Sequence, residues 1–147
     1  SKDTSQKRGW SMSEIRTGRH CVFMLHAHLV FVTKYRREVF DGKALEELEE
    51  IFERVCGQFD VELVEFDGEH DHVHLLVNYP PKVSLSKLVN SLKGVSSRRL
   101  RQSGHKGVDH ALGEAKSLWS PSYFAGSCGG APLEVVKQYI ESQSTPE

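Results

Sequence analysis

The chain has 147 residues, 38% of them hydrophobic, so it is long enough for one domain with a substantial core. No apolar run approaches the roughly 20 residues that a membrane-spanning helix needs, and the polar stretch Ser1–Arg19 lacks the apolar segment of a secretory signal. Three scattered cysteines without a Cys-x-x-Cys pair argue against a zinc ribbon and a secreted disulfide framework, so we expect a cytoplasmic protein.

The net charge of −1 hides an uneven distribution of charge along the chain. Residues 38–69 carry twelve acidic and two basic side chains, whereas residues 1–37 carry eight basic and two acidic ones. Residues 82–108 carry seven basic side chains and no acidic one. A polarised surface of this kind can hold a polyanion although the total charge is near zero. Chance clustering on a solvated surface is the alternative.

The N-terminal part of the chain begins with a polar stretch and continues with an apolar one. Residues 1–18 have little apolar pattern and are expected to form a mobile tail, which leaves one domain over residues 19–147. Cys21–Thr33 is rich in Val and Phe and predicts a strand. Lys34–Arg37 places basic residues around an aromatic one, which suits contact with nucleic acid, although an ordinary charged loop has the same composition.

A helix and a hairpin are predicted next. Apolar residues recur at helical spacing between Asp41 and Gly57, with glutamates on the opposite face, so we expect a helix that covers the core with one side. Val61–Phe66 reads as a strand, Asp67-Gly68 is typical of a turn, and a second apolar strand begins at His72. The two strands are therefore expected to pair as a β-hairpin.

The second strand of this hairpin carries the motif on which the functional interpretation depends. Because strand side chains alternate, His72, His74 and Leu76 share one face, and the apolar residues between them share the other. The apolar face is expected to lie on the core, and the two imidazoles are spaced to chelate one cation. Two polar residues on the solvent side of a strand are the alternative interpretation of an isolated His-x-His.

The C-terminal half predicts another helix, a last strand and a final helix. Ser84 caps an amphipathic helix whose exposed face carries basic and small residues and no carboxylate, which lets a phosphate backbone approach closely. Residues 103–116 have weak periodicity and predict a loop. Residues 118–124 predict an edge strand because they contain a proline. Residues 126–130 predict a flexible glycine-rich joint, and residues from Pro132 onward predict a helix.

The predicted order of elements is therefore β-α-β-β-α-β-α. This order favours an α+β fold with one antiparallel sheet in the split βαβ manner, which is a ferredoxin-like or RRM-like sheet with helices on one face. The other face of the sheet would be open and would carry His72 and His74. The C-terminal helix, which carries Tyr139, is an additional element.

A second set of chemically useful residues lies on this last helix. Tyr139 and Gln143 are four residues apart and would share one helix face. If that face docks over His72 and His74, two imidazole nitrogens and an amide oxygen can bind a cation beside a phenol. Such a nitrogen and oxygen set suits Mg²⁺ or Mn²⁺ better than structural zinc. Each residue alone is more typical of packing or of the surface, so only the combination predicts a site.

The combination resembles a known family. His72-Val73-His74 resembles the HUH motif, and Tyr139 with Gln143 after the glycine-rich stretch 127–133 resembles the single-tyrosine transposases of the insertion sequence 200-like group. These enzymes mobilise insertion sequences as single-stranded DNA. Three further stretches are similar to that family: residues 28–37, 84–101 and 119–121.

The resemblance implies a homodimer on a ferredoxin-like sheet, with active sites at or near the subunit boundary. It implies that His72, His74 and Gln143 bind a divalent metal, Mg²⁺ or Mn²⁺, and that Tyr139 attacks DNA to leave a 5′-phosphotyrosine and a free 3′-OH. It also implies recognition of imperfect DNA hairpins near the ends of the element. Basic clustering in the sequence predicts five DNA contacts: Lys34, Arg36, Lys93, Arg98 and Arg99.

Two other functions remain compatible with the sequence. A non-catalytic or domesticated relative would hold hairpin DNA or RNA on its basic faces, although the intact set of four candidate catalytic residues speaks against it. A phosphodiesterase that uses water would rely on paired histidines, and His26 with His28 in the first strand offers a second pair. Such an enzyme would turn over without a protein-linked intermediate.

Overall fold

The structure, a computed structural model, describes residues 15–115, 117–127 and 133–144. Most of the tail expected at residues 1–18 and part of the joint expected at residues 126–130 lie outside these ranges. Within the described ranges, no helix combines the length and the apolar character that crossing a bilayer requires.

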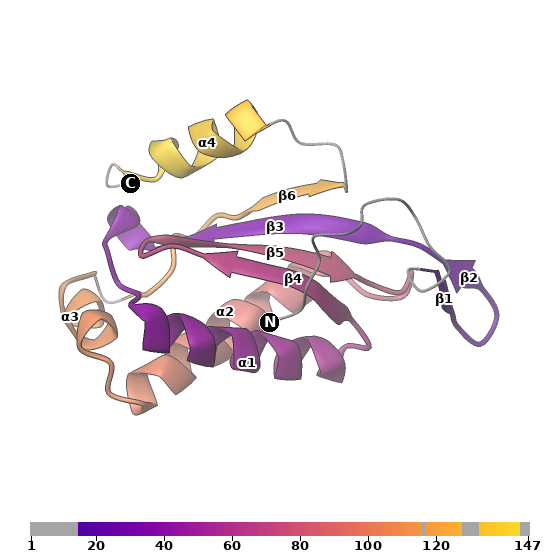
Figure 1. The fold of residues 1–147 in the computed structure, drawn as a ribbon, viewed down its shortest axis with the longest axis horizontal. Coiled ribbons are helices and arrows are strands. Elements are labelled where there is room, and N and C mark those ends of the chain that lie inside the picture. The colour runs from indigo at the N-terminus through magenta and orange to yellow at the C-terminus, as the bar shows by residue number, and fades with distance from the viewer. Residues whose placement is uncertain (1–14, 116, 128–132, 145–147) are drawn as a thin grey trace.

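A four-stranded antiparallel sheet forms the centre of the fold (Figure 1). Its strands run in the spatial order β4 (Glu62–Gly68), β5 (His72–Asn78), β3 (His26–Val32) and β6 (Phe124–Ser127). The hairpin predicted from the sequence is the β4–β5 pair. The long strand predicted at residues 21–33 is divided into β3 and a short strand β2 (Val22–Phe23), which pairs with β1 (Arg16–Thr17).

The helices lie on both faces of this sheet. Helices α1 (Gly42–Gln58) and α2 (Leu85–Gln102) cover one face, and α4 (Leu133–Ser142) lies on the other (Figure 1). The α+β class and the antiparallel sheet are confirmed. The sheet face that was expected to be open carries α4, because Val136 and Ile140 of that helix are apolar and pack on β3.

The two long helices begin where the sequence predicts. The Asp41 carboxylate accepts a hydrogen bond from the Ala44 N–H at 2.8 Å and caps α1, and the Ser84 hydroxyl accepts one from the Lys87 N–H at 3.3 Å and caps α2. Gly57, expected to end α1, lies inside it, and the helix continues to Gln58.

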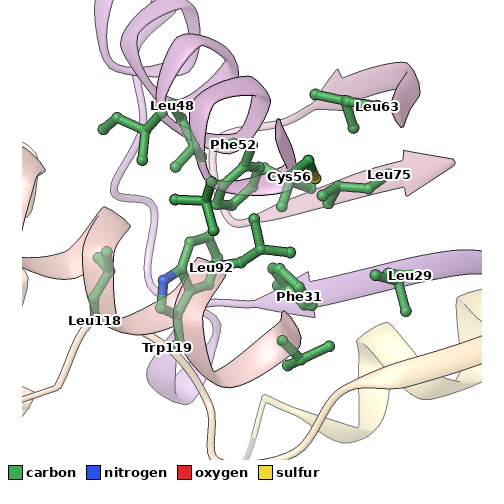
Figure 2. Packing of buried hydrophobic residues seen from close by; sticks show 14 of the residues in the cluster. Leu29, Phe31, Leu48, Phe52, Cys56, Leu63, Leu75, Leu92, Leu118 and Trp119 are labelled. Carbon is green, nitrogen blue, oxygen red and sulfur yellow. The ribbon is translucent and has the colours of Figure 1, made fainter. Parts of the chain in front are cut away.

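The main core fills the space between the sheet and the pair α1 and α2 (Figure 2). Phe31 of β3 meets Phe52 of α1 edge to face, with ring centroids 5.8 Å apart. Trp119 packs against Phe31 as well, and its indole N–H donates to the Ser96 hydroxyl of α2 at 3.0 Å. This hydrogen bond satisfies the polar atom of a large ring that is otherwise buried.

The loop predicted at residues 103–116 is wrong, because residues Lys106–Ala115 form helix α3. Val108 and Ala111 are buried in the main core, so tertiary packing supports a helix whose two glycines weaken its local propensity. Gly107 is required by a close approach: a Cβ there would lie 2.3 Å from the Val39 carbonyl oxygen.

The strand predicted at residues 118–124 is also wrong. Among residues 118–123 only Trp119 makes a β-bridge, with Thr33, and β6 begins at Phe124, the last residue of the predicted strand. Leu118 and Trp119 enter the core as an irregular segment, since their burial outweighs strand pairing. The last strand does lie at an edge of the sheet as predicted.

Candidate active site

The two histidines of the His-x-His motif lie side by side on the face of the sheet opposite the main core. His72 and His74 on β5 pair with Val32 and Val30 on β3, and their ring centroids are 5.0 Å apart. The alternate residues of β5, Val73, Leu75 and Val77, are fully buried in the main core. The predicted division of this strand into a histidine face and an apolar face is therefore confirmed.

His72 is held by its neighbour in the chain. Its Nδ1 lies 2.7 Å from the Asp71 carboxylate, whose other oxygen accepts a hydrogen bond from Arg36 Nε at 2.9 Å. Burial opposes ionisation of this carboxyl, but the hydrogen bonds from His72 and Arg36 outweigh it and hold the pKa of Asp71 below its ordinary value. In a neutral imidazole, a carboxylate that accepts the Nδ1 proton leaves the Nε2 lone pair available to a cation.

His74 is held by a third histidine. Its Nδ1 lies 3.2 Å from Nε2 of His28 on β3, and the two rings stack with centroids 5.3 Å apart. Burial, followed by the neighbouring His72 and His28, lowers the pKa of His74 to about 4. At neutral pH His74 is therefore uncharged, which is the form that binds a metal.

Tyr139 lies on α4, which covers the same face of the sheet. Its ring is half-buried beside Phe124 of β6, with centroids 6.0 Å apart, and its hydroxyl lies 2.8 Å from the Ser122 hydroxyl. Since β3 separates β6 from β5, Phe124 is on the opposite side of β3 from His72 and His74.

Gln143 comes directly after α4, in the turn that ends the helix. Its side-chain oxygen accepts a hydrogen bond from the Ser120 hydroxyl. Tyr139 and Gln143 are thus brought together, as their spacing predicted, but on the segment Ser120–Ser122. Across residues 15–115, 117–127 and 133–144, no cluster of three or more His, Cys, Asp or Glu side chains could hold a metal.

The segment Ser120–Ser122 is fixed from the other side by Lys93 of α2. The Lys93 amine donates to the backbone carbonyls of Ser120 and Ser122, both at 2.8 Å, and lies over the rings of Phe31 and Tyr123. Burial lowers the pKa of Lys93 to about 8. The carbonyls of this segment thus contact α2, while its serine hydroxyls contact the residues of α4 and its terminal turn.

The other predicted DNA contacts fall into two places. Lys34 and Arg36 lie in the short helix η2 (Lys34–Arg36) at the end of β3, near His72. Arg98 and Arg99 lie on α2, on the opposite side of the sheet from α4 (Figure 1). Arg98 is exposed, whereas Arg99 is half-buried beside the glutamates of α1. Arg36 and Lys93 both have internal partners.

Sequence reasoning assigned no role to Asp71, Ser120 or Ser122. Asp71 could have been found, because a carboxylate next to a candidate ligand histidine is a typical orienting group. The serines carried no signal, since their partners are about twenty residues away in the chain. His28 was noted only as part of a pair with His26, and its contact with His74 depends on the register of β3 and β5.

Comparisons with known proteins identify the family. The family model described as "Transposase IS200 like" matches residues 21–143. The ISDra2 transposase TnpA of Deinococcus radiodurans is 31% identical over 134 residues, which is 91% of this chain and 94% of that protein. The transposase for insertion sequence element IS200 of Salmonella typhimurium is 29% identical, over 90% of this chain and 85% of that protein.

Solved structures agree as well. A crystal structure of a candidate transposase from Deinococcus radiodurans superposes with a TM-score of 0.74 at 31% identity, covering 87% of this chain and 97% of that one. The REP-associated tyrosine transposase bound to a REP hairpin has a TM-score of 0.51 at 14% identity, covering 86% and 68%, and shows the likeness of the fold alone. With its family match over most of its length, the chain belongs to the IS200-like transposases.

Proposed function

We propose that this transposase acts on single-stranded DNA, that it binds hairpins at the ends of its element, and that it cleaves and rejoins DNA through a 5′-phosphotyrosine intermediate. One observation carries the proposal. His72 and His74 stand together with both Nδ1 atoms engaged, on the sheet face that also receives the helix of Tyr139. Paired imidazoles oriented in this way are typical of metal ligands.

The proposed metal ligands are His72, His74 and the side-chain oxygen of Gln143, with Mg²⁺ or Mn²⁺ as the cation. When bound, the cation would polarise the scissile phosphate and stabilise the negative charge that develops on it. The two histidines fit this role because both are oriented, His72 by a carboxylate and His74 by His28. Gln143 would have to exchange its hydrogen bond with Ser120 for the metal site.

Tyr139 is the proposed nucleophile. Its phenolic oxygen would form a bond to phosphorus while the bond between phosphorus and the 3′-oxygen breaks. The phenol loses its proton and the departing 3′-oxygen gains one, so the products are a 5′-phosphotyrosine and a free 3′-OH. The reverse attack by a 3′-OH would rejoin the DNA, because the phosphotyrosine bond conserves the energy of the phosphodiester.

We further propose a homodimer built on ferredoxin-like sheets. The antiparallel order β4-β5-β3-β6, with α1 and α2 on one face, supports that sheet type. A swap of α4 between subunits would bring Tyr139 and Gln143 to the partner's histidines.

The DNA is proposed to contact basic side chains in two places, the short helix η2 at the end of β3 and helix α2 on the other side of the sheet. Arg98 is the exposed one of the five predicted contacts, and Lys34 and Arg99 are half-buried. Arg36 and Lys93 would have to give up internal hydrogen bonds. The REP-associated transposase with a similar fold was solved with a hairpin, which supports hairpin DNA as the ligand class.

A denaturing gel for a covalent protein–DNA adduct tests the proposal. The substrate is single-stranded DNA from the ends of the element that encodes the chain, with Mn²⁺, Mg²⁺ and chelator lanes. An adduct is expected with either metal, and it should disappear with chelator and in Tyr139→Phe. Tyr79→Phe is the matched control, because this tyrosine packs beside the main core, and it should form the adduct like the parent.

The other outcomes separate the alternatives. Tight hairpin binding without an adduct, unchanged in Tyr139→Phe, would indicate a binding module. Cleavage without a protein-linked product would indicate water as the nucleophile and would reject the role of Tyr139.

A further inference from the structure

We propose that Asp71 is the positioning residue of His72, and that Arg36 holds Asp71 in the orientation this role needs. The inference rests on the proposed function, since it concerns the metal ligand His72. Its basis is a chain of short contacts in the described structure: His72 Nδ1 to Asp71 Oδ1 at 2.7 Å, then Asp71 Oδ2 to Arg36 Nε at 2.9 Å.

The surroundings of Asp71 hold its carboxylate in a fixed orientation. The residue is 4% exposed, and a buried carboxylate is costly unless both oxygens have partners. Here one oxygen serves the imidazole and the other the guanidinium. The backbone is held as well, because the Asp71 carbonyl accepts hydrogen bonds from the N–H of Thr33 at 3.0 Å and from its hydroxyl at 3.1 Å. The carboxylate therefore has little freedom to turn.

The backbone around Arg36 adopts an uncommon conformation. Tyr35 and Arg36 have φ angles of 59° and 57°, in the left-handed region that residues other than glycine rarely adopt. Such strain persists where the surrounding structure supports it, often at functional sites. The Arg36 side chain that leaves this turn reaches Asp71, thirty-five residues away in the sequence.

Arg36 also links this arrangement to the end of α4. Its Nη1 donates to the Ser144 hydroxyl at 3.2 Å, and Ser144 follows the proposed ligand Gln143. The Nε–H, however, is the donor that Asp71 uses, so the two contacts can be separated by mutation. Arg36 is thus assigned a positioning role, in place of the phosphate contact predicted from its charge.

Without Asp71, the His72 ring would lose the partner that sets its tautomer. Partners of this kind typically account for about 10- to 100-fold in metal affinity. The alternative explanation is that any carboxylate near the cation raises its affinity by charge alone. In that case the removal of Asp67 of β4, which is exposed and pairs with His74, would weaken metal binding as much as the removal of Asp71.

The experiment is a titration of the full-length, metal-free protein with MnCl₂ by isothermal calorimetry. Asp71→Asn is expected to weaken Mn²⁺ binding about 10- to 100-fold. Two variants are controls, and both should bind Mn²⁺ like the parent. Asp67→Asn removes a carboxylate that does not contact His72. Ser144→Ala removes only the hydrogen bond between Arg36 Nη1 and the Ser144 hydroxyl. If Asp71→Asn does not fold, Arg36→Lys carries the test, because it keeps the charge and loses the guanidinium geometry, and it should bind several-fold more weakly.

A second measurement needs no metal. Nitrogen-15 NMR of the parent should show His72 as the tautomer protonated at Nδ1, and this preference should be lost in Asp71→Asn. If Asp71→Asn binds Mn²⁺ as tightly as the parent, or if the His72 proton lies on Nε2, the inference about Asp71 is overturned but the proposed metal site is not. A parent that binds no Mn²⁺ would overturn the proposed metal site, and the inference with it.

Discussion

Lys93 offers a direct test of the two roles that α2 could have. Its charge predicts a phosphate contact, whereas its two hydrogen bonds to the carbonyls of Ser120 and Ser122 indicate that it positions the segment on which Tyr139 rests. Lys93→Met keeps an apolar stem and removes the amine. Lys87→Met is the matched control, since Lys87 is an exposed lysine of the same helix.

The expected change in stability follows from two opposing contributions. Each hydrogen bond from a charged amine contributes about 1.5–3 kcal/mol. Burial of the amine, which lowers the pKa of Lys93 from 10.5 to about 8, costs about 3 kcal/mol. The net loss of unfolding free energy in Lys93→Met at pH 7 is therefore expected to be about 1.5 kcal/mol, the middle of a range of about 0–3 kcal/mol, and Lys87→Met should change it by less than about 0.5 kcal/mol.

The direction in which the free energy of unfolding changes with pH is a second test of Lys93. The pKa of Lys93 is about 8 in the folded chain and near its ordinary value of 10.5 in the unfolded chain. Between these pH values the unfolded chain binds more protons, so this residue's contribution to stability rises toward pH 10.5 and is lost as the pH falls through about 8. Urea unfolding from pH 7 to 10.5 should show this rise in the parent and lack it in Lys93→Met.

Hairpin binding and adduct formation then distinguish the roles. If Lys93 is a positioning residue, the slope of log affinity against log salt stays as in the parent, while adduct formation per bound DNA falls about 10- to 100-fold because Tyr139 is displaced. A slope flatter by about 0.7–0.9, with adduct formation per bound DNA unchanged, would refute this reasoning and restore the phosphate contact.

Two further predictions address α3 and the basic face of α2. Gly107→Ala should destabilise the protein by about 1–3 kcal/mol in urea unfolding, because its Cβ would meet the Val39 carbonyl oxygen at 2.3 Å. Gly113→Ala in the same helix has open space and should stabilise the protein by about 0.5–1 kcal/mol. Equal effects of the two substitutions would contradict the packing of α3. Arg98→Ala should flatten the salt dependence of hairpin binding by about one unit of slope without loss of stability, and an unchanged slope would remove Arg98 from the interface.

Local sequence was sufficient for the elements whose signals are local. The caps Asp41 and Ser84 mark the starts of α1 and α2, and the two-residue alternation around His72 and His74 divides the faces of β5, as the structure confirms. These features depend on neighbours within a turn of helix or along one strand, so the chain carries them in its pattern.

The tertiary structure decided what depends on distant partners. Helix α3 forms because Val108 is buried in a core contributed by other elements, which weak periodicity cannot reveal. The spacing of Tyr139 and Gln143 placed them near each other, but only the fold determines that they rest on Ser122 and Ser120. Charge alone made Lys93 a candidate for DNA, whereas its burial and two carbonyl partners, set by packing across the sheet edge, determine its contacts in the folded chain.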